Sequence, residues 1–292
     1  MCGMKELLLI DANSLIHRSF HALPPLTTPK GKPINAIYGL SSILLKILRE
    51  HSADYVAAAF DRPEPTFREE IYKDYKANRP PAVDELVYQI IKAHEVFEKF
   101  GIKVIEKPGF EADDIIGTLS EKFKNDSVLE DGKIIIFSGD KDNLQLIDRD
   151  KVVVELLKTG VSKTLIYNEG LFLQNYGFEP SKLVDYKALV GDASDNIPGV
   201  AGVGPKGATD LIKKFGSLEK IYEDIELIPK ENLKIKLKNS EKNAFMSKEL
   251  ATMKKNMDLD ISIEDLKRGD INKEELTSYF EELGFKTLVQ RI

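Results

Sequence analysis

The sequence predicts an α/β protein in which a parallel sheet is followed by a helical half. Apolar runs rich in β-branched residues recur through the first half of the 292 residues and alternate with longer segments of helical period. After about Gly170 the pattern is helical and poor in strands. Strands of a parallel sheet are buried on both faces, which is why continuous apolar runs indicate this architecture.

Five strands and four helices are expected in the first half. The expected strands are residues 7–10, 56–60, 102–105, 134–137 and 152–157. The expected helices are residues 13–21, 37–51, 84–100 and 112–123, the last with Ile115, Ile116, Leu119 and Phe123 on one apolar face. The change of pattern places a domain boundary near residues 170–180, which divides the chain into residues 1–175 and 176–292.

Composition and charge exclude several classes of protein. With 42% hydrophobic and 31% charged residues, the chain is neither disordered, collagen-like nor a coiled coil. The apolar runs are strand-sized, far below the roughly 20 residues of a membrane helix. The N-terminus lacks the pattern of a signal peptide, and Cys2 is the only cysteine. We therefore expect a cytoplasmic protein without disulfides or membrane contact.

Nine acidic residues occupy five strand or helix ends. They are Asp11, Asp61, Glu111, Asp113, Asp114, Asp140, Asp142, Asp192 and Asp195. Ligands of an open α/β sheet bind outside the carboxyl ends of its strands, so these acids are expected to converge on one crevice. Each acid alone also has a structural interpretation: Asp11 could cap a helix, and Asp113 and Asp114 could lie in a favourable first helical turn.

The acids as a group indicate a site for divalent cations. Two carboxylates about 4 Å apart repel by roughly 4 kcal/mol at an effective dielectric constant near 20, so such a cluster requires cations. Its hard oxygen ligands favour Mg²⁺ or Mn²⁺, and two such ions suit phosphoryl chemistry. Zinc is disfavoured: His17 and His21 are four residues apart, but Arg18 stands where a metalloprotease has its glutamate.

Basic residues lie in two further stretches. Residues 67–79 contain Arg68, Tyr72, Lys73, Tyr75, Lys76 and Arg79, a mixture suited to holding a single strand of nucleic acid. The alternative for this stretch is an ordinary amphipathic surface helix. Residues 230–255 contain eight lysines and three glutamates, a net charge of +5. The whole chain has a net charge of −6, which becomes +3 when the nine acids are set aside (−6 + 9), so its acidity does not exclude a nucleic-acid partner.

A glycine-rich stretch contains Gly202, Gly204 and Gly207 in a G-x-G-x-x-G spacing. No strand precedes it, so a dinucleotide site is rejected. A glycine turn between two helices, with Lys206 and the later Lys213 and Lys214, instead suits the binding of DNA phosphates by backbone N–H groups. Such binding is independent of base sequence.

These motifs, in this order, resemble the 5′ to 3′ exonuclease domain of bacterial DNA polymerase I, within the flap endonuclease group. The resemblance spans nearly the whole chain, from Asp11 to the Gly-Val-Gly-Pro-Lys206 motif and the ending Tyr279 to Ile292. It implies a PIN-like α/β domain with a helical arch over residues 63–85, followed by a helical DNA-binding domain with a helix-three-turn-helix motif. It also implies cleavage of DNA 5′ ends and flaps in primer removal, replication and repair.

The resemblance also implies roles for individual residues. Asp11, Asp61, Glu111, Asp113 and Asp114 would serve one metal ion, and Asp140, Asp142, Asp192 and Asp195 a second. Catalytic roles fall on Asp11, Asp61, Arg68 and Lys76. DNA contacts fall on Arg18, Arg68, Tyr75, Lys76, Arg79, Gly202, Gly204, Lys206 and Gly207. The backbone near Val200 and Val203 would bind a monovalent cation such as K⁺.

Several alternatives remain at this point. The chain could be a PIN-type ribonuclease, which would not need the helical half, or a catalytically silent DNA-binding module, against which the complete acid set argues. A monomer associated with the bacterial nucleoid is expected. With no residues left for a polymerase, the chain would be either a stand-alone nuclease or the excised domain of a polymerase.

Overall fold

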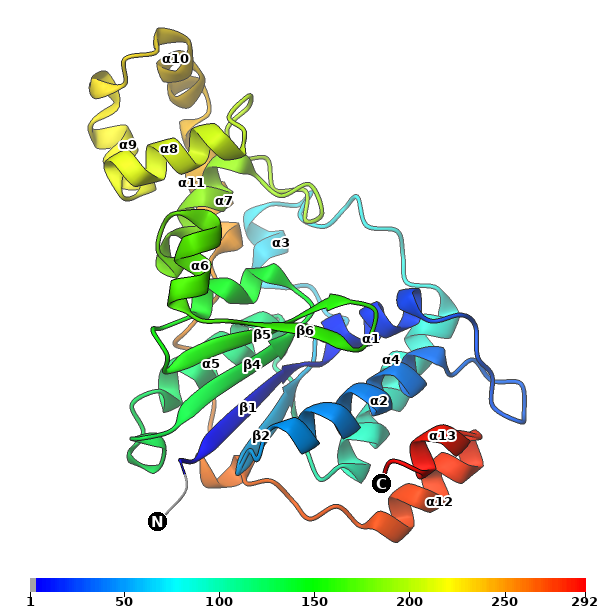
Figure 1. Cartoon of the computed structure of the whole chain (residues 1–292). Coiled ribbons are helices and arrows are strands. Elements are labelled where there is room, and N and C mark those ends of the chain that lie inside the picture. Colours follow the sequence, from blue (N-terminus) through cyan, green and yellow to red (C-terminus); the bar gives the residue numbers. More distant parts are fainter. Residues whose placement is uncertain (1–3) are drawn as a thin grey trace.

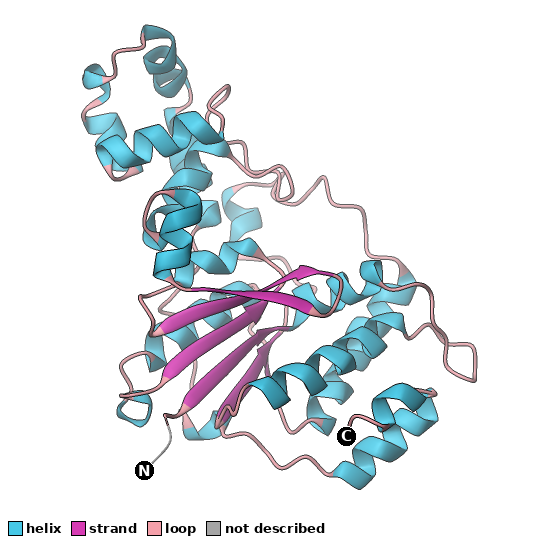
Figure 2. Ribbon diagram, viewed as in Figure 1, coloured by secondary structure: helices cyan, strands magenta, loops and turns pink. Residues whose placement is uncertain are grey.

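A six-stranded sheet lies at the centre of the structure, a computed structural model that describes residues 4–292 (Figures 1 and 2). Its strand order is β3-β2-β1-β4-β5-β6, with β6 antiparallel and the other strands parallel. The strands are β1 Glu6–Asp11, β2 Tyr55–Ala59, β3 Lys103–Ile105, β4 Lys133–Ser138, β5 Val152–Thr159 and β6 Lys163–Tyr167. The five predicted strands are confirmed within two residues at each end. Cys2 lies outside the described residues.

Apolar side chains on both faces explain why the central strands are continuous hydrophobic runs. Leu7 and Leu9 of β1 belong to one buried cluster, whereas Leu8 and Ile10 belong to another. Successive side chains of a strand point to opposite faces, so β1 contributes to both clusters. Each face therefore needs its own cover of helices.

Two sets of helices cover the sheet. One face packs against α1 Ala12–Ala22, α2 Asn35–Glu50, α4 Asp84–Lys99, α12 Lys273–Leu283 and α13 Lys286–Val289. The cluster of the other face includes residues of α5 Ala112–Phe123, α6 Glu169–Tyr176 and α7 Leu183–Val190. The four predicted helices are present, and α5 has the predicted bounds.

Four helices after α7 form the projection seen above the sheet in Figure 1. They are α8 Pro205–Phe215, α9 Leu218–Glu223, α10 Glu231–Asn239 and α11 Glu241–Ala251. A hairpin of residues 191–204 joins α7 to α8, and Gly199 and Gly202 adopt positive φ angles of 62° and 76° there. These left-handed conformations favour glycine, which explains the glycine-rich stretch.

The end of the chain returns to the sheet body, where α12 and α13 pack on the face covered by α2 and α4. Phe280 of α12 lies beside Phe100, with their ring centroids 6.3 Å apart. Residues 176–292 thus contribute to both parts of the molecule. The boundary between residues 1–175 and 176–292 stays a prediction.

Two sequence predictions need correction. The sheet is mixed rather than wholly parallel, because β6 is antiparallel to β5. This edge strand was not predicted: Leu165 and Ile166 are exposed, so it lacks a clear buried face. The predicted arch contains only one short helix, α3 Phe67–Ile71, and turns fill most of residues 72–79. Within residues 4–292, none of the helices is long and apolar enough to cross a bilayer.

Candidate active site

Three of the predicted acids lie at the carboxyl ends of adjacent central strands. Asp11 is the last residue of β1, Asp61 follows β2 by two residues, and Asp140 follows β4 by two residues. Because β1 lies between β2 and β4 in the sheet, the predicted convergence of these acids is confirmed.

Asp11 is held deep in the site by uncharged donors. It is 4% exposed, and its carboxylate accepts hydrogen bonds from the Ser138 hydroxyl at 2.6 Å and the Ser14 backbone N–H at 3.1 Å. Burial raises the pKa of Asp11 to about 6, against the opposing effect of these hydrogen bonds. Asp11 also caps α1, so its structural interpretation is confirmed and is compatible with a place in the site.

Asp61 and Asp113 complete a group with Asp11 that we call the sheet-edge group. Asp61 accepts a hydrogen bond from the Ala112 N–H at 2.7 Å, and Asp113 accepts one from the Asn143 amide at 2.8 Å. Burial raises the pKa of Asp61. Burial, followed by the negative charges of Asp11 and three other aspartates, raises the pKa of Asp113 well above its ordinary value.

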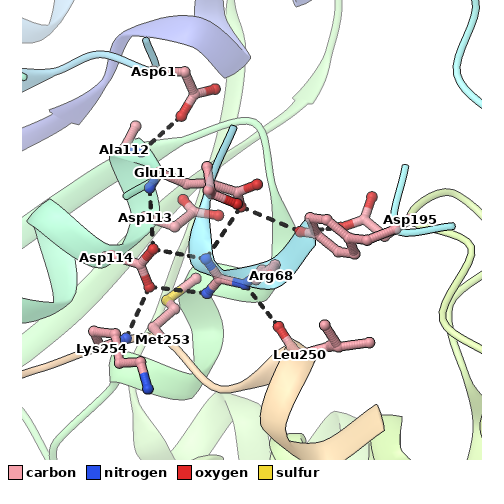
Figure 3. A network of polar contacts seen from close by, with 12 residues as sticks. Asp61, Arg68, Glu111, Ala112, Asp113, Asp114, Asp195, Leu250, Met253 and Lys254 are labelled. Carbon is pink, nitrogen blue, oxygen red and sulfur yellow. Dashed lines mark hydrogen bonds and ion pairs between the residues drawn. The ribbon is translucent and has the colours of Figure 1, made fainter. Parts of the chain in front are cut away.

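Asp114 lies apart from this group, in a buried ion pair with Arg68 (Figure 3). The Arg68 guanidinium donates to both Asp114 oxygens, at 2.7 and 2.9 Å. The same oxygens accept from the backbone N–H groups of Glu111 and Lys254, at 3.1 and 2.8 Å. Asp114 is 0% exposed and Arg68 is 2% exposed. These contacts do not fit the predicted roles of Asp114 as a metal ligand and Arg68 as a DNA-contacting or catalytic residue.

A second group of acids, which we call the cross-unit group, consists of Asp142, Asp192 and Asp195. One oxygen from each lies within 4.8 Å of the others. Asp142 belongs to the 3₁₀ helix Lys141–Leu146, whereas Asp192 and Asp195 follow α7, so two distant parts of the chain build this group. The structure thus brings together three of the four acids predicted for the second metal ion, without Asp140.

Lys187 of α7 contacts two members of the cross-unit group. Its ammonium forms ion pairs with Asp142 and with Asp192, the latter at 2.7 Å. Burial raises the pKa of Asp142 to about 7, aided by Asp140 and opposed by Lys187. For Asp192, burial acts to raise the pKa, but Lys187 and hydrogen bonds from Ser194 outweigh it and lower the pKa to about 2.

The segment of residues 63–85 lies over Glu111 and over Asp195 of the cross-unit group. The Lys76 ammonium donates to Glu111 at 2.6 Å, and Arg79 forms an ion pair with Asp195. The Tyr75 hydroxyl lies between Glu111 and Asp195, at 3.2 and 3.3 Å. The cations predicted to handle DNA thus cover the acids in this structure.

Further predicted residues line two hollows. Arg18 lines a groove of about 720 Å³ with Asp140, Asp142, Lys187 and Asp192. Gly202, Val203, Gly204, Lys206 and Gly207 line another hollow, of about 770 Å³, together with the start of α10. There the Lys236 ammonium donates to the Gly202 carbonyl at 3.1 Å, and the Val200 carbonyl accepts from the Val203 N–H at 3.0 Å.

Two family models match consecutive parts of the chain. Residues 6–177 match the family model of the 5′-3′ exonuclease N-terminal resolvase-like domain, and residues 178–274 match that of the 5′-3′ exonuclease C-terminal SAM fold. The chain belongs to the 5′-3′ exonuclease family.

Relatives of this 5′-3′ exonuclease family member include both long and short proteins. It is 42% identical to DNA polymerase I of Caldicellulosiruptor bescii over 98% of this chain and 33% of that protein. It is 40% identical to a 5′-3′ exonuclease of Aquifex aeolicus over 99% of this chain and 96% of that protein. The chain thus spans about a third of its polymerase relatives.

Solved structures share the fold. T5 5′-exonuclease with bound zinc has a TM-score of 0.68 and 24% identity, covering 86% of this chain and 90% of that one. The catalytic core of Rad2 in complex with a DNA substrate has a TM-score of 0.64 and 18% identity, covering 99% of this chain and 94% of that one. The predicted α/β nuclease fold with a helical half is therefore confirmed.

In this 5′-3′ exonuclease family member, the sequence interpretation missed several residues of the site. Ser14, Ser138 and Asn143 orient the sheet-edge group, and Lys187 lies inside the cross-unit group. One signal could have identified Lys187: a lysine five residues before Asp192, in the helix leading to the predicted site. The serines and the asparagine carry no comparable signal, since their partners are fixed by tertiary contacts.

The donor set of this 5′-3′ exonuclease family member fits hard divalent cations. Every acid side chain of the sheet-edge and cross-unit groups offers carboxylate oxygens, the ligands preferred by Mg²⁺ and Mn²⁺. The raised pKa values of Asp11, Asp113 and Asp142 show that burial and mutual repulsion disfavour their charged forms in the absence of such cations.

Proposed function

We propose that this chain is a divalent-metal-dependent 5′-3′ exonuclease and structure-specific 5′-flap endonuclease that hydrolyses DNA phosphodiesters during primer removal, replication and repair. One observation carries the proposal: acids that follow β4 and acids of the helical half meet at one groove, and a cationic segment pairs with two further acids, Glu111 and Asp195. An arrangement of this kind suits a polyanionic substrate that brings its phosphate to bound cations.

The proposal assigns two Mg²⁺ or Mn²⁺ ions to the acids. Asp11, Asp61, Glu111 and Asp113 would hold one ion, and Asp140, Asp142, Asp192 and Asp195 the other, with some acids shared. Asp114 is left out of the ligand set because Arg68 and two backbone N–H groups occupy its oxygens. When bound, two such ions supply an activated water and stabilise the attacking and leaving oxygens of the displacement.

The cations around the groove would bind the DNA backbone. Lys76 and Arg79 are partly exposed and contact acids at the site, so a phosphate arriving with its metal ions could take them over as partners. Arg18 lines the same groove. Tyr75 is buried between Glu111 and Asp195, and we propose that it orders residues 72–79 and contacts DNA once they rearrange.

The hairpin between α7 and α8 is proposed to hold duplex DNA. Gly202, Gly204, Lys206 and Gly207 lie at the start of α8, where free N–H groups and lysines attract phosphates. The monovalent cation near Val200 and Val203 belongs to this proposal, although Lys236 already brings a positive charge to Gly202.

Two glycines test the hairpin proposal, with one serving as a control for the other. A Cβ atom added at Gly204, where φ is −95°, meets no atom within 4 Å, so Gly204→Val should leave the fold intact and weaken duplex binding only by obstructing the DNA. Gly202→Val should strain the hairpin itself, because φ is 76° there and Lys236 lies close by. Equal duplex binding by Gly204→Val and the wild type would contradict the proposal.

Partners and surroundings are part of the proposal. DNA with 5′ ends, flaps or nicks is the proposed partner of a monomeric protein in the cytoplasm, near the nucleoid. A polymerase domain is a further proposed partner, since relatives named DNA polymerase I are about three times as long as the matched region.

The decisive experiment compares labelled 5′-flap DNA, matched RNA and a blunt DNA duplex, each with Mg²⁺ or with EDTA. We expect short products and released flaps from DNA, in Mg²⁺ only. Preferential cleavage of RNA would support the PIN-type ribonuclease, and binding without cleavage would support a silent DNA-binding module. Asp61→Ala, purified in parallel, controls for contaminating nuclease.

A further inference from the structure

Arg68 joins three segments that are distant in the sequence. It lies on α3, its partner Asp114 lies in the first turn of α5, and its remaining donors reach the end of α11. The Arg68 Nε donates to the Leu250 carbonyl at 2.9 Å (Figure 3). An Nη atom donates to the Thr252 carbonyl at 3.2 Å. A planar guanidinium with five donors can satisfy all these acceptors at once, which a lysine ammonium cannot do.

Residues 250–254, which we call the strap, are tied to the site from several sides. The Lys254 N–H donates to Asp114 at 2.8 Å. The Gln145 side chain donates to the Ala251 carbonyl and accepts from the Met253 N–H, both at 3.1 Å. Gln145 belongs to the same 3₁₀ helix as Asp142. The strap is therefore bonded both to Asp114, which follows Asp113 in α5, and to the 3₁₀ helix that carries Asp142.

An apolar cluster makes the same connection independently of the ion pair. Tyr75 packs with Ile197, Leu250 and Ala251, and Ile71 and Tyr72 lie against them. The Lys76 N–H also donates to the backbone carbonyl of Asp195 at 2.9 Å. Residues 71–76 thus rest on the strap and on the loop that carries Asp195, at the point where Arg68 enters the interior.

We propose that Arg68 is a positioning residue: its buried pair with Asp114 and its bonds to the strap fix Tyr75, Lys76 and Arg79 over Glu111 and the cross-unit group. Arg68 itself makes no contact with DNA, because its donors are engaged and its side chain is 3% exposed. The expected effect of Arg68 on the cleavage rate rests on the proposed function, whereas its expected ordering of residues 71–79 does not.

Two variants separate this proposal from a role in DNA binding. Arg68→Met combined with Asp114→Asn removes the pair without changing the net charge or leaving a buried charge unpaired. Arg68→Lys keeps the positive charge but loses the paired hydrogen bonds of the guanidinium to Asp114. It serves as the test variant if the double variant fails to fold. Arg62→Lys is the matched control, since Arg62 lies in the same segment and pairs on the surface with Glu64.

The first measurement is backbone hydrogen exchange without DNA or metal. We expect the amides of residues 71–79 to exchange at least about tenfold faster in the Arg68 variants, with the β1 and β4 amides unchanged and Arg62→Lys like the wild type. Unchanged exchange in residues 71–79 would overturn the proposal. This readout stands even if the wild type cleaves no DNA, a result that would remove the proposed function alone.

The second measurement is single-turnover cleavage of a 5′ flap, with DNA binding measured in Ca²⁺ at several salt concentrations. We expect the cleavage rate to fall about 10- to 100-fold, as for lost supports of metal sites. The slope of log affinity against log salt is compared in the background of Lys76→Ala with Arg79→Ala, where adding the Arg68 and Asp114 substitutions should leave it unchanged. A slope reduced by about one unit would show a lost phosphate contact and overturn the proposal. Faster exchange with wild-type cleavage would also overturn it, because the pair would then be merely structural.

Discussion

The sheet-edge and cross-unit groups solve the same electrostatic problem in different ways. In the part of the chain that the structure describes, the recorded donors to Asp11, Asp61 and Asp113 are uncharged hydroxyl, amide and backbone groups. The cross-unit group instead has Lys187 and Arg79 as ion-pair partners. The sheet-edge group therefore depends more strongly on an external cation, whereas the cross-unit group is partly neutralised from within.

The largest expected effect is the loss of cleavage when a sheet-edge carboxylate is removed. Asp11→Asn keeps the helix cap of α1 but removes a charged ligand, and Asp61→Asn removes another. We expect cleavage to fall by about 1000-fold or more, at the upper end of what a single electrostatic stabiliser supplies. Single-turnover rates on a 5′ flap check this, and a wild-type rate in either purified variant would mean that the site is wrongly assigned.

The next effect is on stability without metal. The pKa of Asp11 is raised to about 6 in the folded protein, against 3.8 as its ordinary value. The folded state therefore binds the proton more tightly, and stability is lost as the pH rises from about 4 to about 6. The difference corresponds to about 3 kcal/mol at pH 7. In EDTA, Asp11→Asn should raise the unfolding temperature at pH 7 but not at pH 3.5; an equal change at both pH values would contradict this.

The cross-unit group should tune the requirement for metal. Asp192→Asn with Asp195→Asn should raise the Mg²⁺ concentration for half-maximal cleavage about 10- to 100-fold and lower the rate at saturation. DNA binding in Ca²⁺ should hold or tighten, because two negative charges leave a surface that phosphates approach. A Mg²⁺ titration beside a Ca²⁺ binding curve measures both. Weaker binding with an unaltered metal requirement would show that these aspartates are structural.

Lys187→Met should act in the opposite direction. Lys187 contacts Asp142 and Asp192, so its removal leaves two carboxylates without their internal cation. We expect Mn²⁺ to bind about tenfold more tightly, since the Lys187 side chain is 12% exposed and part of its Coulomb energy is lost to screening. Calorimetric titration measures the affinity, and thermal unfolding in EDTA should show a lower unfolding temperature. Weaker Mn²⁺ binding would mean that Lys187 supports the metal site.

The smallest effect concerns Lys76 and Arg79, the two cations of residues 63–85 that pair with acids of the site. Lys76 contacts Glu111, and Arg79 contacts Asp195. If both move to phosphates when DNA binds, Lys76→Ala and Arg79→Ala should each reduce the salt dependence of flap binding by about 0.7 to 0.9 unit of log-log slope. The slopes come from binding curves in Ca²⁺. An unchanged slope in the Lys76→Ala, Arg79→Ala double variant would mean that this segment is only a solvated part of the surface.

Local sequence patterns were enough to predict the central strands, the main helices and the positions of the strand-end acids. Apolar runs and helical periods depend on near neighbours, so β1 and α5 could be predicted from their own residues. The meeting of Asp11 with Asp61 followed too, because neighbouring parallel strands end at the same edge of the sheet. The edge strand β6 was missed because it has no clearly buried face, so its own residues carry no pattern that predicts a strand.

The pairing of charges, in contrast, depends on contacts between distant parts of the chain. Lys187 meets Asp142 across 45 residues of sequence, and Arg68 reaches Leu250 across 182. Arg68 and Lys76 look alike in the sequence, as cations of one basic stretch, yet the first is buried against Asp114 and the second lies over Glu111. The difference arises because burial is set by the packing of α3 against α5 and the strap, contacts that no local pattern encodes.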